Sequence, residues 1–218
     1  MTTGGILPDS AIAGLFEAGA LASGRELDAD QIQPASLDLR LGATAYRVRA
    51  SFMPGKGCTV LDKLNQLKLH EIDLGPGAVL ETGCVYIVPL QEGLALPEAV
   101  RATTNPKSST GRLDIFTRVL TDHAREFDKV PAGYNGPLYL EISPRTFPIL
   151  VREGSRLSQI RFRTGAPTLS GPELQDLHEA ERLSSDSAAD ISGGGIAMSI
   201  DFRDNADGLV GYRGKRHT

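Results

Sequence analysis

Short stretches of alternating apolar and polar residues, broken by glycine or proline, dominate this chain. Residues 36–41 show the pattern clearly, because three leucines alternate with Asp38 and Arg40. A period of two is typical of a strand. It predicts that the leucines face inward and that Asp38 and Arg40 face outward, with Gly42 ending the strand.

Further strands are expected wherever a short apolar run lies between turn residues. They are residues 44–48, 68–72, 79–89, 115–120, 137–142, 147–151 and 157–162. The 24 glycines and 13 prolines also favour many turns and short elements. The sequence therefore predicts a mainly β fold, an antiparallel sandwich or barrel-like structure without βαβ units.

Helical periodicity occurs at two places. Asp9 or Ser10 can cap a short N-terminal helix with Ile12, Leu15 and Phe16 on one face. A second amphipathic helix is expected near residues 173–183.

The chain is predicted to contain three segments. Residues 1–170 form one β domain, and residues 171–195 form the second helix and a flexible linker rich in serine and glycine. Residues 198–203, MSIDFR, repeat the pattern of residues 35–40, ASLDLR. Residues 196–218 are therefore expected to begin a second, truncated copy of the domain.

Composition excludes several classes of protein. With 218 residues, 40% of them hydrophobic, the chain is long enough for a packed core. A net charge of −4 argues against nucleic-acid or membrane binding through a basic face. No apolar run approaches the roughly 20 residues of a membrane span, and the N-terminus lacks a secretory pattern. Cys58 and Cys84 are expected to be thiols in a reducing cytoplasm.

The segment with most chemical content begins with Lys107, Ser108, Ser109, Thr110, Gly111 and Arg112. Two cations and three hydroxyls suit several phosphate oxygens. A solvated turn between strands has the same composition, so the residue types alone leave both interpretations open.

Glu141 lies in the apolar strand expected at residues 137–142, on the face opposite Leu138 and Leu140. It is either an ordinary solvent-facing acid or a general base in a cleft, with partial burial raising its pKa. Tyr134, in the turn before this strand, either stacks on a base or sugar or packs in a hairpin.

A zinc deaminase site is excluded by the sequence. None of the four histidines lies in an H-x-E motif, and the two cysteines are far apart.

Four motifs in order resemble those of dCTP deaminases, in the dCTP deaminase/dUTPase superfamily. They are SLDLRLG at residues 36–42, KSSTGR at 107–112, GYNG at 133–136 followed by Leu140-Glu141, and Gln159-Ile160. The resemblance spans residues 34–162 and is nearest to the longer bacterial members with two tandem domains.

This resemblance implies a distorted jelly-roll (β-clip) fold of the dUTPase type. It implies a homotrimer, or a trimer-like assembly of tandem domains, with active sites between subunits. The implied enzyme is a hydrolase acting on the carbon–nitrogen bond of a cyclic amidine. It converts dCTP to dUTP and ammonia, which supplies dUTP for dUMP and dTTP synthesis. No catalytic metal is expected, and Mg²⁺ accompanies only the triphosphate.

The resemblance also assigns roles to residues. Glu141 would exchange protons with the attacking water and the leaving amine, and Ser108 and Arg112 would hold the water and the charge around it. The remaining substrate-binding residues would be Lys107, Ser109, Thr110, Gly111, Tyr134, Tyr139, Leu140 and Gln159.

The chain departs from the family pattern at several positions. Lys107 replaces a usual arginine, residues 131–133 read Pro-Ala-Gly where many members have Asp-Pro-Gly, and no closing segment is recognisable after Phe162. A dUTPase, a bifunctional enzyme that continues to dUMP, and a non-catalytic assembly domain therefore stay open as alternatives.

Overall fold

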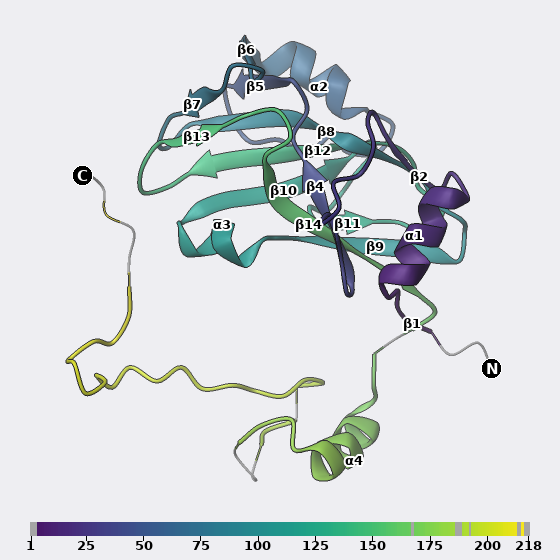
Figure 1. The fold of residues 1–218 in the computed structure, drawn as a ribbon, viewed down its shortest axis with the longest axis vertical. Coiled ribbons are helices and arrows are strands. Elements are labelled where there is room, and N and C mark those ends of the chain that lie inside the picture. Colours follow the sequence, from purple (N-terminus) through teal and green to yellow (C-terminus); the bar gives the residue numbers. More distant parts are fainter. Residues whose placement is uncertain (1–3, 167, 186–188, 192, 213–214, 216–218) are drawn as a thin grey trace. The chain divides into compact units, whose positions relative to one another are not determined.

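The computed structural model describes residues 4–166, 168–185, 189–191, 193–212 and 215. Its contacts divide the chain into two units, of which the second comprises residues 166–212 and the first comprises the described residues outside that range. The strands lie in the first unit, which confirms the prediction of a mainly β fold (Figure 1).

Two antiparallel sheets form the first unit. One has the order β11-β9-β14-β4-β3, with β1 also paired to β14. Its strands are β1 (Gly5–Ile6), β3 (Ile32–Gln33), β4 (Ser36–Arg40), β9 (Val100–Pro106), β11 (Lys129–Val130) and β14 (Arg156–Thr164).

The other sheet has the order β10-β12-β8-β5-β6, with β2 paired to β8. Its strands are β2 (Leu21–Ser23), β5 (Thr44–Val48), β6 (Lys68–Asp73), β8 (Val85–Ala95), β10 (Ile115–Thr121) and β12 (Asn135–Pro144). A separate two-stranded ribbon joins β7 (Ala78–Leu80) to β13 (Ile149–Val151).

The helices are α1 (Asp9–Glu17), α2 (Val60–Leu67), α3 (Ser108–Arg112) and α4 (Gly171–Glu181). Both α1 and α4 agree with the two predicted helices. Helix α2 was not predicted from the sequence, and it begins with a capping box between Thr59 and Asp62. None of the described helices is long and apolar enough to span a bilayer.

The main core lies between the two sheets, where alternate residues of facing strands meet. Leu39 of β4 and Phe162 of β14 come from one sheet, and Val88 of β8 and Leu140 of β12 from the other. This packing explains the period-two pattern of the sequence.

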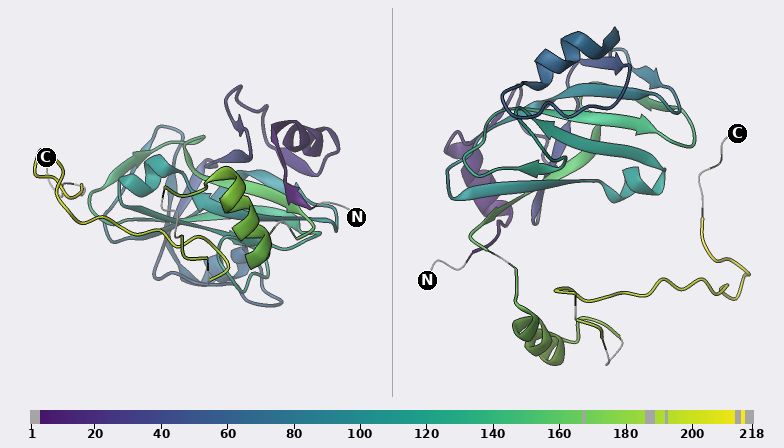
Figure 2. Two further views of the ribbon diagram at one scale, coloured as in Figure 1. Left: turned by 90° about the horizontal axis from the view of Figure 1, so that it is seen from below. Right: turned by 180° about the vertical axis from the view of Figure 1, so that it is seen from behind.

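A smaller core lies on the opposite face of the second sheet. Val60 and Leu64 of α2 pack there with Ile87 of β8 and Tyr139 of β12. Figure 2 shows α2 covering this sheet from outside. Strands β8 and β12 are thus buried on both faces, which is why their runs are more apolar than simple alternation requires.

The predicted outward orientation of Asp38 and Arg40 into solvent is wrong. Asp38 is 2% exposed and Arg40 is 0% exposed. The alternation identified the strand correctly, but it cannot reveal polar partners that come from distant segments. Buried charges are tolerated only when such partners satisfy them.

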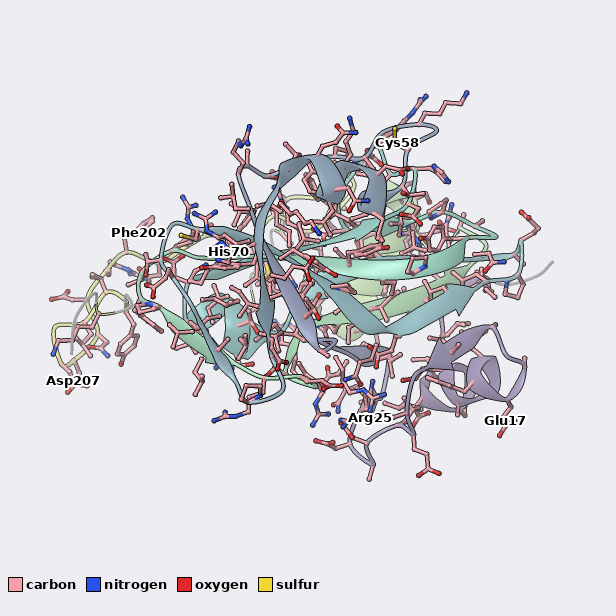
Figure 3. All side chains as sticks on the ribbon, turned by 90° about the horizontal axis from the view of Figure 1, so that it is seen from above. Glu17, Arg25, Cys58, His70, Phe202 and Asp207 are labelled. Atoms are coloured by element: carbon pink, nitrogen blue, oxygen red, sulfur yellow. The ribbon has the colours of Figure 1, made fainter. Side chains whose placement is uncertain are left out.

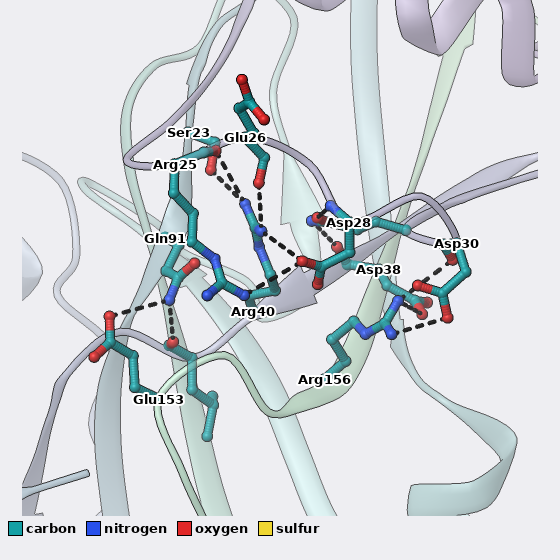
Figure 4. A network of polar contacts seen from close by, with 12 residues as sticks. Ser23, Arg25, Glu26, Asp28, Asp30, Asp38, Arg40, Gln91, Glu153 and Arg156 are labelled. Atoms are coloured by element: carbon teal, nitrogen blue, oxygen red, sulfur yellow. Dashed lines mark hydrogen bonds and ion pairs between the residues drawn. The ribbon is translucent and has the colours of Figure 1, made fainter. Parts of the chain in front are cut away.

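Arg40 connects the two sheets through a buried ion pair. Its Nε donates to Oε1 of Glu92 on β8 at 2.8 Å, and its backbone N–H donates to Oε2 of the same carboxylate at 2.8 Å. The guanidinium also donates to Ser23 Oγ at 2.6 Å and to the carbonyl of Glu26 at 2.9 Å (Figure 4). Gln31 donates to Glu92 as well, at 2.8 Å.

Asp128 forms a second polar junction between the sheets. Its Oδ1 accepts from the Val119 N–H of β10 at 2.8 Å and from Thr104 Oγ1 of β9 at 2.8 Å. Asp128 adopts a left-handed backbone with φ of 62°, a conformation that aspartate tolerates better than most residues. Burial raises the pKa of this carboxyl above its ordinary value of 3.8.

The second unit contains α4, which begins with a capping box between Ser170 and Glu173. The predicted linker, residues 184–195, lies partly outside the described residues, since 186–188 and 192 are not among them. In the predicted second copy, residues 196–212 and 215 are described, and Met198, Ile200 and Phe202 are exposed. Residues 213–214 and 216–218 lie outside the described part, so a second copy stays a prediction.

The Arg40–Glu92 junction predicts a large stability effect. Arg40→Met leaves the buried Glu92 carboxylate without its cation, so the free energy of unfolding should fall by about 3–5 kcal/mol in urea denaturation. Lys68→Ala, which removes an exposed pair with Glu71, is the control and should change little. An Arg40→Met protein as stable as the parent would contradict this role.

Asp128 predicts a pH-dependent stability of defined sign. A raised pKa in the fold means that the protonated form is preferred there, so the contribution of Asp128 to stability is fully present below pH 3.8 and is lost as the pH rises through the raised value. Asp128→Asn should remove this decline, and it should gain stability relative to the parent on going from pH 4 to 6, measured by urea unfolding.

Asp30→Asn is the matched control for the Asp128 experiment. A hydrogen bond from Arg156 lowers the pKa of Asp30, so the parent should gain stability over this variant as the pH rises from acid. If the stability difference from the parent changed with pH in the same direction for both variants, the raised pKa of Asp128 would be refuted.

Candidate active site

The predicted phosphate-binding segment forms the short helix α3 and its entry, at the end of β9. The Lys107 N–H donates to the carbonyl of Leu157 in β14 at 3.0 Å, which fixes the start of the segment. Thr110 is buried, whereas Ser108, Ser109 and Arg112 line a cavity of about 310 Å³ together with Lys107 and Gln159. The structure therefore brings Gln159 of β14 to the predicted segment.

Carboxylates share this cavity with the cations. Asp38 and Asp30 also line it, and Lys107 Nζ pairs with Asp38. Arg156 lies 3.6 Å from Asp38 and donates to Asp30 at 2.9 Å (Figure 4). A phosphate that binds Lys107 must therefore compete with the Asp38 carboxylate.

Glu141 lies in the middle of β12 and is 1% exposed, so it is not the solvent-facing acid of the first interpretation. In the sheet it stands opposite Arg118 of β10 and Ile87 of β8. Its Oε1 accepts from Arg118 Nη2 at 2.7 Å and from Nε at 3.1 Å. Its Oε2 is buried, and among the described residues it has no hydrogen-bond partner.

Arg118 belongs to this site but was not predicted from the sequence. Its guanidinium lies 3.5 Å from the centre of the Phe127 ring and 4.9 Å from that of Phe116, and it donates to Ser51 Oγ at 2.8 Å. The alternation of residues 115–120 contains a signal, because Phe116 and Arg118 share the face opposite Ile115 and Val119. This alternation does not give the register of β10 against β12, which places Arg118 opposite Glu141.

Two predicted substrate-binding tyrosines are packed in the interior. The Tyr134 hydroxyl donates to the Pro137 carbonyl at 2.7 Å and accepts from the Asp122 N–H at 3.1 Å. Burial raises the pKa of Tyr134 and of Tyr139 to about 12. Tyr139 packs beneath α2, and Leu140 lies in the main core.

Tyr134 also lines a separate cavity of about 510 Å³. The rim of this cavity includes the basic residues Arg101, Arg125, Lys129 and Arg163.

Within one chain the predicted site residues thus fall into separate places. Ser108, Arg112 and Gln159 share the cavity beside α3, whereas Glu141 lies under Arg118 in the other sheet. Across the described residues, no hydrogen bond or ion pair joins Glu141 to Ser108 or Arg112.

Among the residues that the structure describes, no group of three or more His, Cys, Asp or Glu side chains could hold a metal ion. Figure 3 shows Cys58 and His70 at separate places.

Comparison with known proteins relates both parts of the chain to one family. Residues 3–166 match the model of the 2'-deoxycytidine 5'-triphosphate deaminase N-terminal domain, and residues 170–218 match that of its C-terminal domain. The crystal structure of 2'-deoxycytidine 5'-triphosphate deaminase from Agrobacterium tumefaciens is 66% identical with a TM-score of 0.92. The match covers 99% of this chain and 64% of that chain, so the chain spans less than two thirds of the solved protein.

Curated relatives are more distant in sequence. A dCTP deaminase of Halorubrum lacusprofundi is 29% identical over 193 residues, which is 83% of this chain and 92% of the relative. A dUMP-forming dCTP deaminase of Coprothermobacter proteolyticus is 29% identical over 158 residues, which is 72% of this chain and 81% of the relative. The match of the N-terminal domain model over residues 3–166 confirms the resemblance seen in the motifs: the chain belongs to the dCTP deaminase family.

Proposed function

We propose that this protein hydrolyses the C4–N4 bond of dCTP to give dUTP and ammonia. The observation that carries the proposal is Glu141, a buried carboxylate in mid-strand with one oxygen paired and the other, Oε2, without a partner among the described residues. A buried acid with an unused oxygen is suited to proton transfer. The family of the chain supplies the substrate class.

In the proposed reaction Glu141 acts first as base and then as acid. Its carboxylate takes a proton from a water molecule while the oxygen of that water bonds to C4 of cytosine. That proton moves to ring N3 as the C4–N3 double bond is lost. The carboxylate then carries the remaining hydroxyl proton to the 4-amino nitrogen, the C4–N4 bond breaks, and ammonia leaves as the C4 carbonyl forms. Ser108 and Arg112 would hold the water and the charge that develops on the ring.

The triphosphate is assigned to the cavity beside α3. Lys107 and Arg112 supply cations there, and Ser108 and Ser109 supply hydroxyl donors. Mg²⁺ would enter as part of the nucleotide substrate. We assign the reaction to the cytosol, because Cys58 and Cys84 are free thiols.

A complete site would need a second copy of the chain. Within one chain, no hydrogen bond or ion pair among the described residues joins Glu141 to Ser108 or Arg112, whereas the proposed chemistry needs these side chains on one nucleotide. A homo-oligomer, such as a trimer, would place the α3 segment of one copy beside Glu141 of another.

Formation of dUMP is the second candidate. The relative from Coprothermobacter proteolyticus is named a dUMP-forming dCTP deaminase, and such an enzyme would also release pyrophosphate. Assaying ammonia and pyrophosphate together separates the two activities. Release of neither product by the full-length protein would favour a non-catalytic assembly domain.

The central variant is Glu141→Gln, which keeps the size of the side chain but cannot accept the proton. In the full-length protein, ammonia release from dCTP should fall by about 100- to 10,000-fold. Glu81→Gln, at an exposed position before β8, is the control and should retain full turnover. Undiminished ammonia release by Glu141→Gln would contradict the proposal.

The shared site predicts complementation between two inactive variants. Glu141→Gln carries an intact α3 segment, and Ser108→Ala/Arg112→Ala carries an intact Glu141, so mixed oligomers should contain some complete sites. Co-expression with two different tags, purification over both, and an ammonia assay should show restored turnover. Mixed oligomers as inactive as each parent, or the absence of any mixed oligomer, would show that the site is not shared between copies.

A further inference from the structure

The two oxygens of the Glu141 carboxylate have different surroundings. Two nitrogens of the Arg118 guanidinium donate to Oε1, Nη2 at 2.7 Å and Nε at 3.1 Å. Among the described residues, Oε2 has no donor, although it is equally buried. One oxygen is therefore committed to Arg118, and only the other is left to exchange a proton.

Arg118 is itself held in place on several sides. The Phe127 ring lies 3.5 Å from its guanidinium carbon, and Phe116 lies on the same strand at 4.9 Å. Nη2 also donates to Ser51 Oγ at 2.8 Å. A guanidinium stacked on aromatic rings and bonded at its nitrogens loses little further freedom when it orients a carboxylate.

Further residues that cover the outer face of the second sheet contribute to the packing around Arg118. Phe52, Met53 and Phe127 pack against the small core that includes Tyr139, which lies two residues before Glu141 in the strand. Ser51 belongs to the same connection between β5 and α2. The connection thus fixes Arg118 from outside while β10 fixes it from inside the sheet.

We infer that Arg118 is a positioning residue that holds Oε1 of Glu141 and reserves Oε2 for proton exchange with the water and the amine. This inference rests on the proposed function. Without Arg118 the carboxylate could rotate, and either oxygen could take the proton in an unproductive direction. The inferred effect is therefore on the chemical step, with little change in nucleotide binding.

A purely structural role is the competing explanation, since an arginine opposite a buried glutamate also satisfies its charge. The two explanations differ in what restores activity. A small guanidinium ion can occupy the space of a truncated Arg118 and orient Oε1 again, whereas it would not repair a misfolded strand pair.

The test uses the full-length protein with Arg118→Ala and Arg118→Lys. For Arg118→Ala, kcat for ammonia release should fall about 10- to 100-fold, the loss expected for a charge-assisted hydrogen bond, while KM for dCTP changes less than threefold. Added guanidinium chloride at millimolar concentration should recover part of kcat. Arg118→Lys keeps a cation but not the paired donors, so it should lie between the parent and Arg118→Ala.

The control is Arg145→Ala, an exposed arginine just after β12. It should keep the parent kcat and should not respond to guanidinium. Melting temperatures of all variants show whether each is folded. If Arg118→Ala does not fold, the kcat of Arg118→Lys decides the outcome.

Two results would overturn the inference. The first is that kcat is unchanged in both Arg118 variants. The second is that kcat falls equally in Arg118→Ala and Arg118→Lys and that added guanidinium does not restore it. Either result leaves the proposed function standing as long as Glu141→Gln abolishes turnover. If Glu141→Gln stays active, the proposed function itself fails, so the two failures are distinguishable.

Discussion

The buried ion pair between Arg40 and Glu92 is the interaction on which the arrangement of the first unit depends. It joins β4 of one sheet to β8 of the other without access to solvent. Strand β4 also carries Asp38, which holds Lys107 at the entry of α3. Strand β4 therefore carries both the arginine that joins the two sheets and the carboxylate that holds the predicted phosphate-binding segment. Since a buried pair contributes little net stability unless its geometry is complete, the several donors around Glu92 are as important as the pair.

Period-two alternation was enough to predict most strands, because every second residue of a strand faces the core between the sheets. It found β4, β5, β10, β12 and β14 within a few residues. It failed for Asp38 and Arg40, whose burial depends on Lys107 and Glu92, far away in the sequence. It also missed α2, whose Val60 and Leu64 cover the outer face of a sheet that alternation treats as solvent-exposed.

The candidate site could be predicted by residue type but not by position. The motifs identified Glu141 and the segment at residues 107–112, and the structure adds that no hydrogen bond or ion pair among the described residues joins Glu141 to Ser108 or Arg112. Arg118 could not be found from spacing, because its relation to Glu141 arises only from the register of β10 against β12. Residues 131–133 read Pro-Ala-Gly in place of Asp-Pro-Gly, but they still form a turn, in which the Tyr134 N–H donates to the Pro131 carbonyl at 3.3 Å.

The central claim is that Glu141 is the proton-transferring group of a site completed by the α3 segment of another copy. The most direct measurement is a crystal structure of the full-length Glu141→Gln protein with dCTP bound. The account predicts C4 of cytosine within one water molecule of residue 141 in one copy, and the triphosphate on residues 107–112 of a second copy. A nucleotide bound away from residue 141, or bound by residues 107–112 and residue 141 of the same copy, would contradict it.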